Sequence, residues 1–286
     1  MFAGLIRSLP AGLLLLLLAR GALPRGTWIL RALLLGTLNI GLFFAMLFLA
    51  AYRLPGGIAA MVNAIQPLLV IALSAVALGT PIRLIHVGAG LLGALGVTLL
   101  LSLSTSHLDP VGIAAAFAGA CSMASGIVLT KKWGRPVGLL VFTGWQLIAG
   151  GLVLLVPTLV LEGVPDHITG TNVMGYAYLS LIGACLAYFL WFRGIEQLAA
   201  SAASFLSLIS PLVATVLGFL LLGQRLTFWQ LLGMVSIVTA VLGGQLLTGR
   251  VPAAAGVSQS PRQAPGPAQS AQSGSTQPSS GASRSE

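Results

Sequence analysis

The sequence predicts an all-α protein, a polytopic transmembrane helix bundle. Of its 286 residues, 57% are hydrophobic and only 7% are charged, whereas a soluble domain has about 25% charged residues. The apolar residues gather into runs of about 20, the length that a helix needs to cross the hydrocarbon core of a bilayer. Because lipid offers the backbone no hydrogen-bond partner, each run is expected to be helical. So few charges exclude a water-soluble domain.

Nine apolar runs follow one another along the chain. The first is the shortest, and its arginine followed by leucines leaves a signal peptide as an alternative. Two later runs contain a proline near their middle, and two contain small-residue segments, GAGLLGALG and GIAAAFAGACSMASG, that allow close helix approach. The predicted spans are 2–19, 28–52, 56–79, 84–104, 111–130, 138–161, 173–192, 199–223 and 226–248. The remainder, 249–286, is rich in Ala, Gly, Ser, Pro and Gln, which predicts a disordered cytoplasmic tail.

The basic residues are distributed unevenly between the two sides of the predicted membrane. If all nine runs cross it and the C-terminus lies inside, the outer side holds only Arg7, Arg53 and Arg225. The inner side holds Arg20, Arg25, Arg31, Arg83, Lys131, Lys132, Arg135, Arg193, Arg250, Arg262 and Arg284. Positive charge favours the cytoplasmic side of bacterial-type membranes. The pattern therefore predicts a multi-pass protein of the cell inner (plasma) membrane, and it disfavours the signal peptide.

An internal repeat relates the two halves of the chain. The stretch LPGGIAAMVNAIQPLLVIALSAVALGTPIR (54–83) aligns without a gap with LAASAASFLSLISPLVATVLGFLLLGQRLT (198–227) at an offset of 144 residues. With a shift of five residues from that offset, RSLPAGLLLLL (7–17) aligns with QLIAGGLVLLV (146–156). Only the span 111–130 has no counterpart in the first half of the chain. The position of that counterpart would lie upstream of Met1. We therefore expect two repeats of five helices with the first helix missing, namely 1–104 with four helices and 105–248 with five.

Five is an odd number, so the two halves are expected to have opposite orientations in the membrane. Inverted repeats with a binding site at their interface are typical of secondary transporters. Pro67 and Pro211 occupy matching places, each near the middle of its span. A proline removes one helical hydrogen bond and frees the carbonyl four residues earlier, and transmembrane helices also tolerate prolines without any function. Because the prolines match, we predict a substrate pathway lined by Asn63, Gln66, Pro67, Ser207, Ser210 and Pro211.

Other polar and aromatic residues are weaker candidates for the pathway. Asn39 and Gln146 lie within spans, where each could face a cavity or bond a neighbouring helix. Tyr188 and Trp191 are interpreted as interfacial anchors. No acidic or basic residue is expected at mid-depth, which favours a neutral or zwitterionic substrate and disfavours a buried carboxylate as proton relay. With three histidines, none of them mid-span, and no acidic cluster, we expect no catalytic residue, no metal and no cofactor.

Three segments resemble the drug/metabolite transporter superfamily, and in particular its EamA-type ten-helix members. They are the paired segments PLLVIALSAVALG and PLVATVLGFLLLGQRLTFWQLLGM, and the segment AYFLWFRGIEQLAASAASFLSLISP. The resemblance covers residues 2–248. Family members usually have Gly-Glu-Arg-Leu-Thr after the second proline helix, and often an acidic residue at the first-half equivalent. This chain has Gln224 and Thr80 at those positions, which puts a role for that carboxylate in doubt.

The resemblance implies a secondary transporter that moves small metabolites across the inner membrane by alternating access. An exporter of amino acids or similar compounds is the expectation. A small-multidrug-like efflux protein for cations and a non-transporting membrane scaffold are the alternatives. The expected partners are a small-molecule substrate and the lipid bilayer, without nucleic acid, and the sequence leaves a homodimer open.

Overall fold

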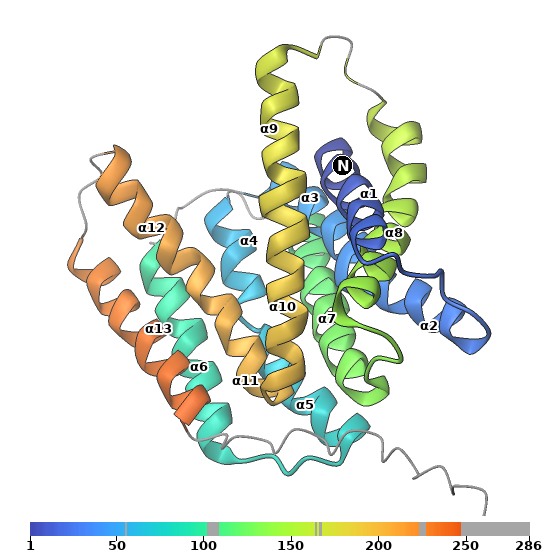
Figure 1. The fold of residues 1–286 in the computed structure, drawn as a ribbon. Helices are drawn as coiled ribbons and strands as arrows, with labels where there is room; N and C mark the ends of the chain where they lie inside the picture. The colour runs from blue at the N-terminus through green and yellow to red at the C-terminus, as the bar shows by residue number, and fades with distance from the viewer. Residues whose placement is uncertain (55, 102–108, 164, 166–167, 223–226, 247–286) are drawn as a thin grey trace, which may run out of the picture. The chain divides into compact units, whose positions relative to one another are not determined.

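The computed structural model describes residues 1–54, 56–101, 109–163, 165, 168–222 and 227–246, and residues Met1–Val251 form one compact unit. All regular secondary structure in these ranges is helical (Figure 1), which confirms the predicted fold class. The first elements are α1 (Phe2–Leu18), α2 (Thr27–Gly36), η1 (Thr37–Gly41), α3 (Leu42–Arg53), α4 (Gly56–Asn63), α5 (Gln66–Leu78) and α6 (Leu84–Leu101). They are followed by α7 (Pro110–Trp133), α8 (Leu139–Pro157), η2 (Thr158–Glu162), α9 (Gly170–Ser180), η3 (Leu181–Leu186), α10 (Ala187–Gln197), α11 (Ala200–Phe205), η4 (Leu206–Leu208), α12 (Ile209–Leu222) and α13 (Phe228–Leu246).

Several of these elements join end to end into longer helices. Within the described ranges, seven helices are long and apolar enough to cross a membrane: Thr27–Arg53, Ile58–Leu78, Pro110–Trp133, Leu139–Glu162, Gly170–Gln197, Ala200–Leu221 and Phe228–Leu246. The shorter apolar helices Phe2–Leu18 and Leu84–Leu100 occupy the other two predicted runs. Each predicted run therefore coincides with a helix, while the total of nine spans and the missing first helix stay predictions. The predicted tail, 249–286, lies outside the described residues, as does Gln224.

Irregular turns occur at matching places in the two halves of the chain. The π-helical turns η1 and η3 begin at Thr37 and Leu181, which are 144 residues apart. A π-helical turn contains one residue more than the α-helical pattern allows, and such turns often occur at functional sites. The same offset relates residue 64, in the break between α4 and α5, to Leu208, the last residue of η4. The structure thus supports the division of the chain at residues 104 and 105, which remains a proposal.

Glycines allow two pairs of helices to pack with their backbones in contact. The helix α1 lies along α8, and α6 lies along α13 (Figure 1). A Cβ atom on Gly12 would lie 3.0 Å from the carbonyl oxygen of Gly144. A Cβ atom on Gly233 would lie 2.6 Å from the carbonyl oxygen of Gly96, and one on Gly96 would lie 2.9 Å from that of Gly233. Small residues stabilise membrane helix pairs in this way because they increase backbone contact.

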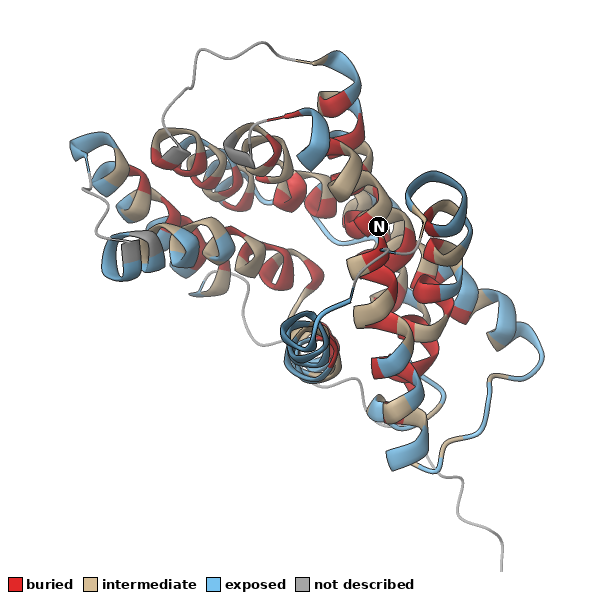
Figure 2. Ribbon diagram, turned by 90° about the horizontal axis from the view of Figure 1, so that it is seen from above, coloured by how far each residue is buried: buried red, intermediate tan, exposed pale blue. Residues whose placement is uncertain are grey.

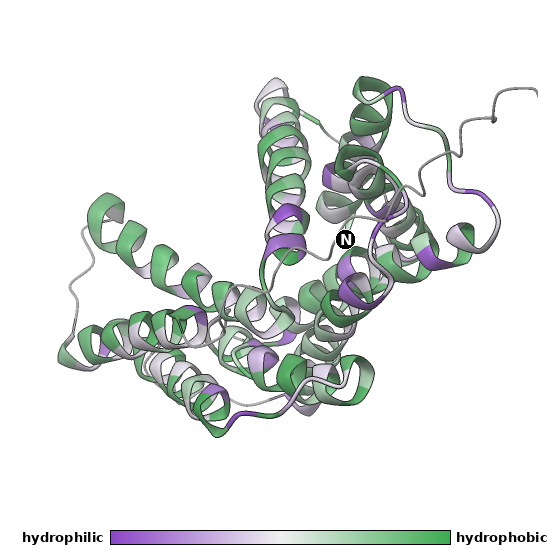
Figure 3. Ribbon diagram, turned by 60° about the horizontal axis from the view of Figure 1, so that its bottom comes forward, coloured by the Kyte–Doolittle hydropathy of each residue, from purple (hydrophilic) through white to green (hydrophobic). Residues whose placement is uncertain are grey.

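The outer faces of the helices are apolar. Large hydrophobic side chains such as Val76 and Leu30 are 89% and 71% exposed, and apolar residues cover the helices on outward faces as well as inward ones (Figure 3). Buried residues occupy the helix faces that turn toward neighbouring helices (Figure 2). Because a soluble protein rarely exposes apolar patches of this extent, these faces are expected to contact lipid.

Ion pairs join helices at their ends. Arg53, the last residue of α3, donates to Asp109 over 3.0 Å, and Asp109 also caps α7 by accepting a hydrogen bond from the Val111 N–H. The hydrogen bond from the Arg53 side chain and that from the Val111 backbone hold the pKa of Asp109 below its usual value. Arg135, which follows the end of α7, pairs over 2.6 Å with Glu196 in the last turn of α10. Both pairs are partly exposed, so water and salt screen them and each contributes little to stability.

Candidate functional site

Both of the predicted proline-containing helices, those with Pro67 and Pro211, are interrupted before the proline and are not simply kinked at it. In the first half, α4 ends at Asn63 and a new helix, α5, begins at Gln66, so that Pro67 occupies its first turn. Proline fits this position well, because the amide hydrogen that it lacks would have no partner there. In the second half the chain passes through the 3₁₀ turn η4 into α12, with Pro211 as its third residue. The sequence thus predicted the place of each interruption correctly.

The two interruptions lie in one apolar cluster. The helix α5 packs against α11, and residues on both sides of the breaks, Ala64, Phe205 and Leu208, are buried in the same cluster as Ile71 and Ala240. Segments that are far apart in the sequence therefore meet where each proline helix is broken. Their membership of one cluster is consistent with an inverted repeat, which stays a prediction.

The polar side chains beside the breaks differ in their surroundings. Gln66 is buried, and its Nε2 donates no hydrogen bond; Asn63 is half-buried, and its buried Oδ1 accepts none. A buried amide without a partner is costly, so both groups are available to a ligand. Ser207 instead donates to the carbonyl oxygen of Ser204 over 2.7 Å, and Ser210 is exposed. The assignment of these residues, with Pro67 and Pro211, to the pathway stays a prediction.

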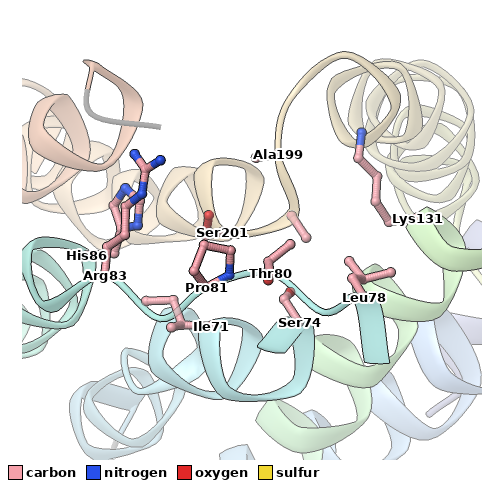
Figure 4. A pocket seen from close by; sticks show the side chains of 11 residues that line it. Ile71, Ser74, Leu78, Thr80, Pro81, Arg83, His86, Lys131, Ala199 and Ser201 are labelled. Atoms are coloured by element: carbon pink, nitrogen blue, oxygen red, sulfur yellow. The ribbon is translucent and has the colours of Figure 1, made fainter. Parts of the chain in front are cut away.

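A cavity of about 320 Å³ opens between α5 and α11. Figure 4 shows its lining, which comes from α5, the segment that follows α5, and the starts or ends of α6, α7 and α11. The lining residues are Ile71, Ser74, Leu78, Thr80, Pro81, Arg83, His86, Lys131, Ala199, Ala200 and Ser201. The hydroxyl of Ser74 is buried and has no hydrogen-bond partner. Thr80 belongs to this lining; in the family that the sequence resembles, its position often holds an acidic residue. None of the described residues of the lining is acidic.

Asn39 and Gln146 bind each other. Asn39 lies in the π-helical turn η1, where it is fully buried, and its Nδ2 donates to Gln146 Oε1 over 2.8 Å and to Thr130 Oγ1 over 3.2 Å. Gly126 leaves the space for this amide, since a Cβ atom there would lie 2.2 Å from Asn39 Oδ1. The contact joins three long helices. Of the two interpretations that the sequence left open for Asn39, the structure favours the bond to a neighbouring helix.

Two aromatic residues and one arginine lie deeper than the sequence predicted. Tyr188 is buried and Trp191 packs against the same core, so the interpretation of both as interfacial anchors is wrong. Arg7 was placed at the outer surface, yet its guanidinium donates to the carbonyl oxygen of Gly183. Gly183 lies at the middle of the helix Gly170–Gln197. The prediction that no charged group lies at mid-depth is therefore wrong as well, because a long side chain carries the charge away from its own backbone position.

Comparisons with known proteins agree with this architecture. Residues 1–102 and 110–243 match the model of the EamA-like transporter family. The chain is 50% identical to Protein PecM of Dickeya dadantii over 244 residues, which are 85% of this chain and 82% of that protein. It is 31% identical to the uncharacterized inner membrane transporter YedA of Escherichia coli K12 over 258 residues, which are 86% and 82% of the two chains.

More distant proteins extend the comparison. The chain is 28% identical to a probable amino-acid metabolite efflux pump of Salmonella typhimurium over 225 residues, which are 73% of this chain and 75% of that protein. One solved crystal structure superimposes with a TM-score of 0.72 and 21% identity, covering 86% of each chain, and this likeness shows the fold. Because the family model matches most of the sequence and the relatives match along most of their own length, the chain belongs to the EamA-like transporter family, within the drug/metabolite transporter superfamily, and is a multi-pass transporter of the inner membrane.

Proposed function

We propose that this transporter exports amino acids or similar small polar metabolites by alternating access, with the substrate held between the halves 1–104 and 105–248. The observation that carries the proposal is the meeting of two interrupted helices, α4–α5 and α11–α12, beside a cavity. Interrupted helices leave backbone and side-chain groups free near the middle of the membrane, where a polar substrate needs partners.

The geometry supports a route as well as a binding place. The cavity runs from Ile71 on α5 past Ser74 to Arg83, at the start of α6, so it lies along the face of α5 that turns to the other half. The predicted inner residues Arg83 and Lys131 both belong to its lining, which supports an opening on the cytoplasmic side and a cytoplasmic C-terminus. Export as the direction is supported by the efflux activity in the name of the Salmonella relative.

Removal of the amides beside the first break is expected to reduce export. In proteoliposomes loaded with a mixture of radiolabelled amino acids, Asn63→Ala and Gln66→Ala should each lower the efflux rate about tenfold, the effect of losing one hydrogen bond of roughly 1.4 kcal/mol. Asn172→Ala, which removes an exposed amide at the start of α9, is the matched control and should leave efflux unchanged. The amount of inserted protein is measured for every variant.

Two outcomes would contradict the proposal in different ways. If both amide variants insert normally and export at the wild-type rate, the substrate does not pass the break at Asn63 and Gln66. If the wild-type protein releases no labelled amino acid faster than protein-free liposomes do, the proposed substrate class is wrong.

A further inference from the structure

Arg7 places a positive charge inside the helix bundle. Its guanidinium donates to the carbonyl oxygen of Gly183 and lies over the ring of Phe44, 4.7 Å from its centroid. Gly183 is about equally far from both ends of the 28-residue helix Gly170–Gln197. An ionisable residue at such a depth is costly and is retained where it binds a substrate, an ion or a partner charge.

No carboxylate in the described part of the chain neutralises this arginine. The three acidic residues described there are engaged elsewhere: Asp109 pairs with Arg53, Glu162 with the N-terminal amine, and Glu196 with Arg135. The Nε of Arg7 is buried and has no hydrogen-bond partner. The carbonyl and the aromatic ring satisfy only part of the guanidinium, which has five donors, so the group keeps both a charge and a donor for a ligand.

The repeat alignment relates this contact to a second one. In that alignment Arg7 corresponds to Gln146, and Gly183 corresponds to Asn39. Gln146 and Asn39 are hydrogen-bonded to each other over 2.8 Å, while Arg7 and Gly183 also contact each other. The same pair of positions thus meets twice in the molecule, once as a neutral amide pair joined by a hydrogen bond and once as a cation opposite a glycine.

Gly183 has no side chain that could occupy the space beside the cation. A Cβ atom added at Gly183 would lie 3.7 Å from its nearest neighbours, Arg7 Nη2 and the Leu179 side chain, which is an ordinary contact. At the counterpart position the Asn39 amide is buried against Gln146. Position 183 thus has no side chain beside Arg7, whereas the equivalent Asn39 has an amide that bonds Gln146.

Aromatic rings border the same region. The rings of Phe44 and Tyr188 meet edge to face with their centroids 6.4 Å apart. The centroids of the Tyr188 and Phe192 rings are 6.0 Å apart. Trp191, one turn after Tyr188, packs on this core with a buried indole N–H that has no acceptor. The unpartnered Nε of Arg7 is a hydrogen-bond donor, so it favours a ligand that carries acceptors and negative charge.

We infer that Arg7 is a substrate-binding residue that holds the carboxylate of the transported compound, so that the substrate class is small organic carboxylates. The planar guanidinium binds a carboxylate through two parallel hydrogen bonds, which an ammonium group does not do. The inference rests on the proposed function, because it names the group of an exported amino acid that the protein recognises. The cavity between α5 and α11 has a lining of the same charge character: Arg7 is not among its described lining residues, but Arg83, His86 and Lys131 are, and none of these described residues is acidic.

Binding measurements test the inference without any transport. Wild-type protein in lipid nanodiscs is titrated calorimetrically with benzoate, benzamide and benzylamine, which share a planar ring and differ in charge. Benzoate should bind roughly tenfold more tightly than benzamide, and benzylamine more weakly than both. Arg7→Met should abolish the preference for benzoate, whereas Arg7→Lys should retain a reduced preference because it keeps the charge and loses the planar fork.

The control and the contradicting outcomes are equally specific. Arg193→Met, which removes an exposed arginine from α10, should keep the full preference, and thermal unfolding shows that each variant is folded. Wild-type protein that binds none of the three compounds, or binds benzoate no better than benzamide, would overturn the inference, as would an Arg7→Met variant that still prefers benzoate. If the preference is found but no amino acid is exported, the proposed export fails and the carboxylate site stands.

Discussion

Replacement of Ser201 by tryptophan is expected to reduce transport to the rate of protein-free liposomes. Ser201 lies near the start of α11 and lines the cavity of about 320 Å³ between α5 and α11. An indole at this position fills space that the substrate needs, while the rest of the bundle keeps its contacts. Efflux of labelled amino acids from proteoliposomes measures the effect.

Two matched variants separate blockage from misfolding. Ser201→Ala keeps the cavity open and should transport at a rate close to the wild type. Val235→Trp adds the same indole to an exposed position on α13 and should also leave transport intact. A Ser201→Trp variant that is inserted and still transports normally would show that the substrate does not use this cavity.

Replacement of Gly233 by leucine is expected to separate α6 from α13 and to destabilise the protein strongly. A Cβ atom at Gly233 would lie 2.6 Å from the Gly96 carbonyl oxygen and 2.7 Å from the Leu100 backbone nitrogen. Backbone atoms cannot move aside as a side-chain end can, so the helices must part. Overpacking costs about 1–3 kcal/mol and occasionally more, and we expect a value at or above the upper end of that range.

The measurement is thermal unfolding of the purified protein in detergent. Gly243→Leu, on the same helix, is the control, because a Cβ atom at Gly243 would have no neighbour within 4 Å. This variant should melt close to the wild type. Equal melting temperatures for the two leucine variants would contradict the close approach of α6 and α13.

Much of the fold could be predicted because the membrane imposes simple rules on a chain. A span must be apolar, helical and about 20 residues long, so each predicted run coincides with a helix. The interruptions at Pro67 and Pro211 could be predicted for a similar reason, since the effect of proline on a helix is local. The π-helical turns η1 and η3 have no such signature, because one extra residue in a turn leaves the composition unchanged.

The candidate site was harder to predict, because it depends on which helices meet. Sequence position gives the depth of a Cα atom but not the direction of a long side chain, so Arg7 was assigned to the surface although its guanidinium reaches Gly183. The same limit explains the burial of Tyr188 and Trp191, which looked interfacial. The repeat alignment did contain a signal for this site, since it aligned Arg7 with Gln146 and Asn39 with Gly183.

The central claim is that substrate passes between α5 and α11, which move relative to each other during transport. Cysteines introduced at Ser74 and Ser201, on opposite sides of the cavity, in a background without Cys121 and Cys185, allow the two helices to be joined by a reducible bifunctional thiol reagent. We expect efflux to stop on cross-linking and to return on reduction. Full efflux from protein shown to be cross-linked would contradict the claim.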